Sequence, residues 1–178
     1  MQISGLAIAI IAVVVLLVVL AAGWAYQTAN RLDRLNVRVD LARQALDAAL
    51  ERRAVVARAI AAGMIASYDE EARVAGQELA VAADHAEHAP PHAREQAENR
   101  VSGLLARTDT HSRSQGLVVE LADAETRVMM ARRFYNDAVR DTRNLGERRL
   151  IRWLHLGGTA ELPQFFEIIE RVTPGSGS

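Results

Sequence analysis

The stretch LDRLNVRVDLARQALDAALERRAVVARAI, residues 32–60, decides the fold. Apolar residues recur in it in alternating steps of three and four positions, at Leu32, Leu35, Val39, Ala42, Leu46, Ala49, Val56 and Ile60. Such spacing lines up the apolar side chains along one side of a helix. Arg53 fills the one polar gap in this seam, and its long side chain can extend along the seam to reach an acid. The sequence therefore predicts a long helix, ending at about residue 65, with one buried side.

An uncharged and largely apolar run of 24 residues, Ile3–Tyr26, precedes this stretch. As a helix rising about 1.5 Å per residue it measures roughly 36 Å, which exceeds a hydrocarbon core of about 30 Å. Trp24 and Tyr26 stand at its downstream end, where aromatic rings suit the headgroup boundary. A cleaved signal peptide is the alternative, but it needs a basic start, and Met1–Ser4 has no basic side chain. We therefore expect residues 1–27 to form a transmembrane anchor, with the lipid bilayer as its partner.

Positive charge flanks only the downstream end of this run. Arg31, Arg34, Arg38 and Arg43 follow Tyr26 closely, whereas no arginine or lysine precedes the run. Positively charged flanks tend to remain in the cytoplasm. We therefore expect a single-pass protein of the cell membrane, with its N-terminus outside and the remainder of the chain in the cytoplasm.

Three further helices are predicted downstream. Ser67-Tyr68-Asp69-Glu70 has the pattern of a capping box, in which Ser67 caps the second helix. Pro90-Pro91 ends that helix, because proline lacks an N–H and disfavours helix before it. A third helix is expected over residues 92–107 and, after a polar loop, a fourth over residues 117–145. Their inward-facing residues are Ala72, Ala75, Leu79, Ala82 and Ala86, then Ala97, Val101 and Leu104, then Leu121, Ala124, Val128, Ala131, Tyr135 and Ala138.

The predicted fold class is all-α: an N-terminal transmembrane helix followed by an up-and-down four-helix bundle with long antiparallel helices. The bundle should span residues 28–145. A single coiled-coil rod is the alternative, but Pro90-Pro91 and two loops favour folding back. Residues 146–172 form an amphipathic C-terminal segment that docks on the bundle or presents a face to a partner, and residues 173–178 form a flexible tail.

Composition argues against several classes of function. The 21 basic and 22 acidic residues give a net charge of -1, without the basic excess of nucleic-acid-binding proteins, so no nucleic-acid partner is expected. Cysteine is absent, which excludes disulfides, thiol catalysis and cysteine-ligated zinc. No phosphate loop, nucleophile arrangement or helix-borne zinc motif occurs, so we expect no cofactor and no enzymatic activity.

The most specific motif lies in the predicted fourth helix. The sequence ETRVMMARRFYNDAV, Glu125–Val139, resembles the signature of the LemA family, a Glu-x-Arg-Ile/Val-x-x-Ala-Arg-x-x-Tyr-Asn-Asp-Ala-Val run on the last long helix. The N-terminal span, Asn30-Arg31-Leu32 and Phe165-Phe166 are also similar to that family. Two elements depart from it: Val55-Val56-Ala57-Arg58 replaces a Leu-Ile-Pro-Asn stretch, and Gly146-Glu147-Arg148-Arg149 replaces a Phe-Pro element.

The resemblance implies a helical bundle on a single membrane anchor and no known reaction, because the LemA family is usually regarded as non-enzymatic. The matching residues form the family-signature set: Glu125, Arg127, Ala131, Arg132, Tyr135, Asn136 and Asp137. Because its polar members are dense on an otherwise alanine-lined helix, this set is also the candidate interaction surface. The residues themselves allow two interpretations. In the first, they recognise another protein. In the second, they pair helices: Arg127 or Arg132 reaches acids on a neighbouring helix, and Tyr135 is packed with its hydroxyl hydrogen-bonded.

Two other groups of residues suggest chemistry. His85 and His88 are three positions apart on one helical face and could share a metal ion, which would suit a membrane-bound metal-dependent hydrolase. A solvated helix end, where histidine cations suit the helix dipole, is the simpler interpretation, and we expect no metal site. The segment 148–156 mixes basic and bulky apolar residues, including Arg148, Arg149, Arg152 and Trp153. It either lies against the cytoplasmic leaflet or caps the bundle.

These patterns together predict a non-enzymatic, membrane-tethered helical scaffold or interaction module. Its partner is an unidentified protein or a second copy of the chain, the latter giving a structural homo-oligomer.

Overall fold

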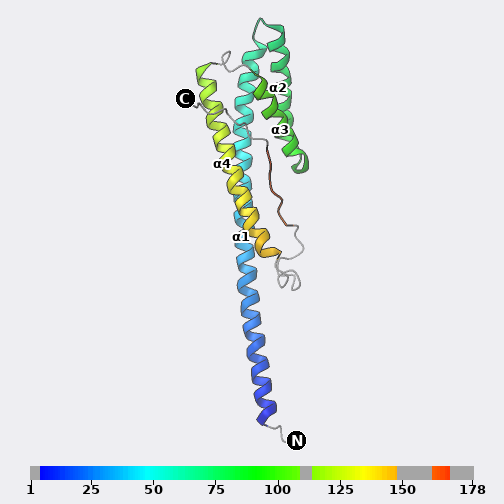
Figure 1. Ribbon diagram of the computed structural model, residues 1–178, viewed down its shortest axis with the longest axis vertical. Helices are drawn as coiled ribbons and strands as arrows, with labels where there is room; N and C mark the ends of the chain where they lie inside the picture. The colour runs from blue at the N-terminus through cyan, green and yellow to red at the C-terminus, as the bar shows by residue number, and fades with distance from the viewer. Residues whose placement is uncertain (1–4, 109–113, 148–161, 169–178) are drawn as a thin grey trace, which may run out of the picture. The chain divides into compact units, whose positions relative to one another are not determined.

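The computed structural model describes residues 5–108, 114–147 and 162–168 (Figure 1). These residues form four helices and no strand: α1 (Gly5–Ile65), α2 (Glu70–His88), α3 (Pro91–Arg107) and α4 (Gln115–Gly146). The predicted fold class, an all-α chain with an up-and-down bundle, is confirmed. A single rod is excluded, because α2 and α3 are separated by only Ala89 and Pro90 and pack against each other.

The chain divides into two compact units, each assembled from segments that are distant in sequence. Unit 1 comprises Met1–Asp40 and Ala138–Pro163, and unit 2 comprises Leu41–Asp137 and Gln164–Ser178. Helices α1 and α4 contribute to both units, whereas α2 and α3 belong to unit 2 alone.

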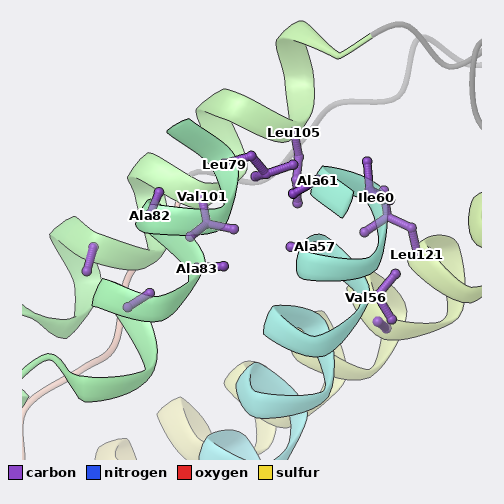
Figure 2. Packing of buried hydrophobic residues seen from close by; sticks show 13 residues of the cluster. Val56, Ala57, Ile60, Ala61, Leu79, Ala82, Ala83, Val101, Leu105 and Leu121 are labelled. Carbon is purple, nitrogen blue, oxygen red and sulfur yellow. The ribbon is translucent and has the colours of Figure 1, made fainter. Parts of the chain in front are cut away.

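All four helices supply the hydrophobic core of unit 2 (Figure 2). Seven of its thirteen buried residues are alanines, so the helices approach closely and each side chain buries little area. The core consists of Val56, Ala57, Ile60 and Ala61 of α1, Leu79, Ala82, Ala83 and Ala86 of α2, Ala97, Val101 and Leu105 of α3, and Leu121 and Ala124 of α4.

The predicted seam of α1 is confirmed in both units. In unit 1, Leu32 is buried against Leu145 of α4 and the half-buried Leu35. In unit 2, the seam positions from Leu46 to Ile60 are buried, Arg53 included. The helix continues through Gly63, although glycine is a weak helix former.

The start of α2 differs from the prediction. Asp69, and not Ser67, is the N-cap: its carboxylate accepts the backbone N–H of Glu71 at 3.1 Å. The Ser67 hydroxyl instead accepts the N–H of Asp69 at 3.2 Å. The predicted capping box is wrong because Glu70 pairs with Arg73 on the next turn of the helix.

Helices α3 and α4 follow the prediction with small shifts. Helix α3 begins at Pro91, whose fixed φ suits the first helical position, and Leu105 is its fully buried leucine while Leu104 is half-buried. Helix α4 extends two residues upstream of the predicted start, to Gln115. The seam predicted for α4 is buried except for the half-buried Ala131.

The first part of α1 is apolar, and the described residues leave it exposed. Eleven large apolar side chains between Ile8 and Leu20 are each 52–61% exposed. Within the described residues, α1 is the one helix whose length and composition would allow it to cross a membrane. A signal sequence meets the same two criteria, so the structure identifies a candidate span.

The C-terminal part of the chain is described over residues 162–168, which form neither helix nor strand and are extended (Figure 1). Residues 148–161 and 169–172 of the predicted segment 146–172 lie outside the described residues. The same holds for Arg148, Arg149, Arg152 and Trp153, the candidates for membrane contact, and for the predicted tail 173–178.

Candidate interaction site

Tyr135 and Asn136 of α4 bind residues 164–168 of the chain, which we call the C-terminal strap. The Tyr135 hydroxyl donates to the carbonyl oxygen of Gln164 at 2.9 Å. The Asn136 side chain makes two bonds to Phe166: Nδ2 donates to its carbonyl oxygen at 3.0 Å, and Oδ1 accepts its N–H at 2.9 Å. All three bonds join a side chain of α4 to the main chain of the strap.

Helix α3 supplies a fourth bond. A carboxylate oxygen of Glu95 accepts the backbone N–H of Glu167 at 3.0 Å. Glu95 lies in the second turn of α3, so the strap contacts two helices of unit 2. Of the two alternatives left open for the C-terminal segment, docking on the bundle or binding a partner, the strap shows the first.

Burial controls the chemistry of Tyr135. The residue is only 4% exposed, and this burial raises the pKa of the phenol above its ordinary value. The Arg43 guanidinium offsets part of the shift, while the carboxylates of Asp47 and Glu95 add to it. The phenol therefore stays protonated and donates its hydrogen bond at all physiological pH values. The prediction of a packed Tyr135 with a satisfied hydroxyl is confirmed.

The other candidate residues of the run Glu125–Val139 differ from Tyr135 in their contacts or in their burial. Arg127 is 66% exposed at its side chain and pairs with Asp123 one turn earlier on α4, at 2.7 Å. This carboxylate raises the pKa of the guanidinium. Of the two arginines considered for pairing with a neighbouring helix, Arg127 instead pairs with this acid of its own helix. The remaining signature residues are half-buried: Glu125, Ala131, Arg132 and Asp137.

A buried ion pair joins α1 to α3. Arg53 Nη2 lies 2.7 Å from Glu98 Oε2, and the two side chains are 5% and 3% exposed. Arg53 Nη1 also donates to the Ser102 hydroxyl at 3.0 Å. The prediction that Arg53 extends to an acid is confirmed, and Glu98 is that acid.

The pair belongs to a longer network. Arg94 Nε donates to the second oxygen of Glu98 at 3.1 Å, and Arg94 Nη1 donates to the backbone carbonyl of Glu87 on α2 at 3.1 Å. The Glu87 carboxylate pairs with Arg58 of α1. Ion pairs thus link α1 to both α3 and α2, and a bond to a backbone carbonyl links α3 to α2, so these contacts join three helices of unit 2.

A shallow apolar groove of about 600 Å³ runs between α1 and α4 in unit 2. Four alanines line it: Ala45, Ala48, Ala49 and Ala131. Phe134 and Met130 also line it and are 63% and 51% exposed. Arg52 pairs with Glu120 at 3.5 Å, so both arginines that line the groove, Arg52 and Arg127, have acidic partners. An exposed aromatic beside small apolar side chains suits contact with another helix.

The histidines of α2 lie apart from this surface. His88 Nδ1 is 2.9 Å from the backbone carbonyl of Asp84 on its own helix, and both side chains are 73% exposed. His85 lines a separate groove between α2 and α3 together with Arg100. Across residues 5–108, 114–147 and 162–168, no three histidine or acidic side chains come together as metal ligands.

Glu98 and Glu95 were missed by the sequence reasoning. For Glu98 a signal exists: Arg94, Glu98, Val101 and Leu105 are spaced by four, three and four positions, the spacing of an apolar seam. A carboxylate buried at a seam position needs a cation beside it, and Arg53 is the cation in the seam of α1. No such signal marks Glu95, because its partner is a backbone N–H of a segment 72 residues away.

Tyr135, Asn136 and Glu95 contact the strap through hydrogen bonds to its main-chain atoms. No protein-family model, curated protein or solved structure matches the chain.

Proposed function

We propose that the chain is a membrane-tethered helical interaction module of the LemA type, without catalytic activity. The observation that carries the proposal is the continuity of α1. One helix, Gly5–Ile65, supplies both the uncovered apolar residues and four residues of the core of unit 2. The resemblance of Glu125–Val139 to the LemA signature supports the same conclusion.

Insertion of the apolar part of α1 into a bilayer is favourable. Each of the eleven large apolar residues between Ile8 and Leu20 contributes about 0.3–0.6 kcal/mol to insertion, or roughly 3–7 kcal/mol together. An arginine at the centre of the span costs about 2.5–3.5 kcal/mol. Two arginines therefore offset the whole gain.

The double variant Val14→Arg/Leu17→Arg tests the anchor. The variant should leave the membrane fraction, whereas the wild-type chain should resist alkaline extraction and keep residues 1–27 by intact mass measurement. The control is Val37→Arg/Leu41→Arg, at positions of closely similar exposure further along α1, which should stay in the membrane. A mature chain that lacks its N-terminal residues would show that the segment is a signal peptide, and the proposed tether would be wrong.

Orientation follows from Arg31, Arg34, Arg38 and Arg43, which support a cytoplasmic body and an external N-terminus. The absence of cysteine makes this easy to test, because one introduced thiol is the only one present. Tyr68→Cys lies at a fully exposed position between α1 and α2. It should react with an impermeant maleimide in inverted membrane vesicles and not in intact cells; the reverse pattern would reverse the orientation.

The groove between α1 and α4 supports an interaction role. Its exposed Phe134 and its lining alanines are both apolar, so the aromatic ring of one copy could pack on the alanines of another. Its edge carries arginines and acids in equal number, Arg52 with Glu120 and Arg127 with Asp123, so two copies can exchange ion-pair partners. Self-association into a homo-oligomer is therefore the second candidate function.

Photo-crosslinking in living cells separates the two candidates. A photoreactive amino acid is placed at Phe134, with the similarly exposed Val119 of α4, outside the groove, as the matched control. An adduct of twice the chain mass, specific to position 134 and lost in Ala48→Arg, indicates self-association. An adduct with a different protein, lost in the same variant, indicates an adaptor. Equal labelling at both positions, or none, would contradict an interaction role for the groove.

A further inference from the structure

We propose that Tyr135, Asn136 and Glu95 form a binding site for an extended peptide, which the chain fills with its own strap and which also accepts an extended apolar segment of another protein. The inference deepens the proposed function, since it assigns a second contact surface to the interaction module. The occupant in trans is defined by chemistry: an extended main chain with apolar side chains at the positions of Phe166 and Ile168.

The first argument is that the site recognises main-chain atoms. Asn136 presents one donor and one acceptor to the N–H and C=O of a single residue, Phe166, as a neighbouring strand would. Tyr135 binds a carbonyl oxygen, and Glu95 binds an N–H. Any extended segment carries these groups at the same spacing, so the contacts do not require the strap's own sequence.

The second argument is that the site is built by the helices and not by the strap. Tyr135 is held by burial in the seam of α4, and Asn136 follows it on the same helix. Glu95 stands on α3, and both helices belong to the core of unit 2. A vacant site would leave the amide of Asn136 and the hydroxyl of Tyr135 without these partners, which is unfavourable for half-buried and buried groups. A peptide from elsewhere would restore the same bonds.

The third argument is that the strap belongs to no helix or strand. Four hydrogen bonds join its main chain to side chains of α3 and α4. Its side chains alternate, with Phe166 and Ile168 half-buried and Phe165 and Glu167 exposed. The net gain from each hydrogen bond is comparable to the entropy lost on ordering each residue. Exchange with a competing segment is therefore accessible.

The test uses the full chain in detergent micelles and a fluorescent peptide with the sequence of residues 162–168, LPQFFEI. The variant Phe166→Pro removes the N–H that Asn136 accepts, and so loosens the strap without changing a residue of the site. Fluorescence anisotropy should show the peptide binding this variant about tenfold more tightly than the wild-type chain, where the strap competes. Adding Asn136→Ala should reduce the affinity again by about tenfold or more, as expected for two lost hydrogen bonds.

Two controls make the result specific. Met130→Ala, on α4 but in the other groove, should leave peptide binding in the Phe166→Pro background unchanged. A peptide with proline at the position of Phe166 should bind the Phe166→Pro chain clearly more weakly than LPQFFEI does. Equal affinity of the LPQFFEI peptide for the wild-type and Phe166→Pro chains, or an affinity that Asn136→Ala leaves unchanged, would overturn the proposal.

A second measurement covers the case in which Phe166→Pro disturbs folding. Hydrogen exchange of the wild-type chain should show protected amides at Phe166 and Glu167, and excess LPQFFEI peptide should accelerate exchange in the strap. Unchanged exchange at saturating peptide would refute displacement. Membrane retention and the crosslinked adduct at Phe134 do not involve the strap. If both are still observed while the peptide fails to bind, only the proposed peptide site is wrong and the proposed function stands.

Discussion

The buried pair of Arg53 and Glu98 offers the sharpest test of how the bundle is held together. Removing one member of a buried ion pair strands the other charge, which costs about 3–5 kcal/mol. The structure predicts unequal costs for the two members. Glu98→Leu strands Arg53, whose side chain is 5% exposed, whereas Arg53→Met leaves Glu98 still bound to Arg94 at 3.1 Å.

These contacts set the expected order of stabilities. Glu98→Leu should lower the free energy of unfolding by about 3–5 kcal/mol, and Arg53→Met by a smaller amount, about 2–3 kcal/mol. The double variant Arg53→Met/Glu98→Leu should be more stable than Glu98→Leu alone, because no stranded charge remains; Arg94, 15% exposed, can turn toward water. The coupling energy should therefore exceed about 1 kcal/mol.

Urea unfolding of the full chain in detergent, followed by far-ultraviolet circular dichroism, measures all three variants against the wild type. The exposed pair Arg38–Asp141 is the matched control, and its double-mutant cycle should give less than about 1 kcal/mol. A coupling energy for Arg53 and Glu98 as small as that of the exposed pair would refute the structural role assigned to the network. A Glu98→Leu variant as stable as the wild type would refute this structural role as well.

Three further predictions concern single positions. In Gly76→Ala the new Cβ would lie 2.9 Å from the Ala61 carbonyl oxygen, so the free energy of unfolding should fall by about 1–3 kcal/mol. Gly103 lies in open space on α3, so Gly103→Ala should raise the free energy of unfolding by about 0.4–1 kcal/mol. Thermal denaturation compares the two variants. Asp69→Ala removes the N-cap of α2 and should lower the free energy of unfolding by about 0.5–2 kcal/mol, while Ser67→Ala should lower it clearly less. Equal decreases for the two variants in urea unfolding would instead favour Ser67 as the cap. Because burial raises the pKa of Tyr135, the folded chain holds that proton more tightly than the unfolded chain, so the contribution of Tyr135 to stability should be constant below about pH 10 and decline above it. Tyr135→Phe should remove this part of the decline in urea unfolding at alkaline pH, and an unchanged alkaline profile would contradict the burial assigned to Tyr135.

Local patterns in the sequence predicted most of the fold. The seam of α1, the break at Pro90 and the seam of α4 depend on spacing along one helix, and each is found in the structure. The cap of α2 was misplaced because Ser67 and Asp69 both suit an N-cap, and the choice depends on where Glu70 points. Local signals of similar strength do not determine such a choice.

The candidate site could be predicted only in part. A polar Tyr135 on an apolar seam indicates a buried hydroxyl that needs a partner, and that much follows from the sequence. The partner is a backbone carbonyl of the strap, 29 residues downstream, and every segment of chain carries backbone carbonyls. The sequence therefore shows that the bond is needed without showing where it goes.

The polar contacts of unit 2 acquire their importance from its alanine-rich core. Seven alanines among thirteen core residues bury little area, and a helix lined with alanine can slide along its neighbour at small cost. Sliding α3 against α1 would separate Arg53 from Glu98, and sliding α2 would drive a neighbouring backbone onto Gly76. The strap adds a further constraint, because its bonds join α3 and α4 through Glu95 and Asn136. The small residues thus allow close packing, while a few buried polar groups and one glycine select a single register from the many that alanine would permit.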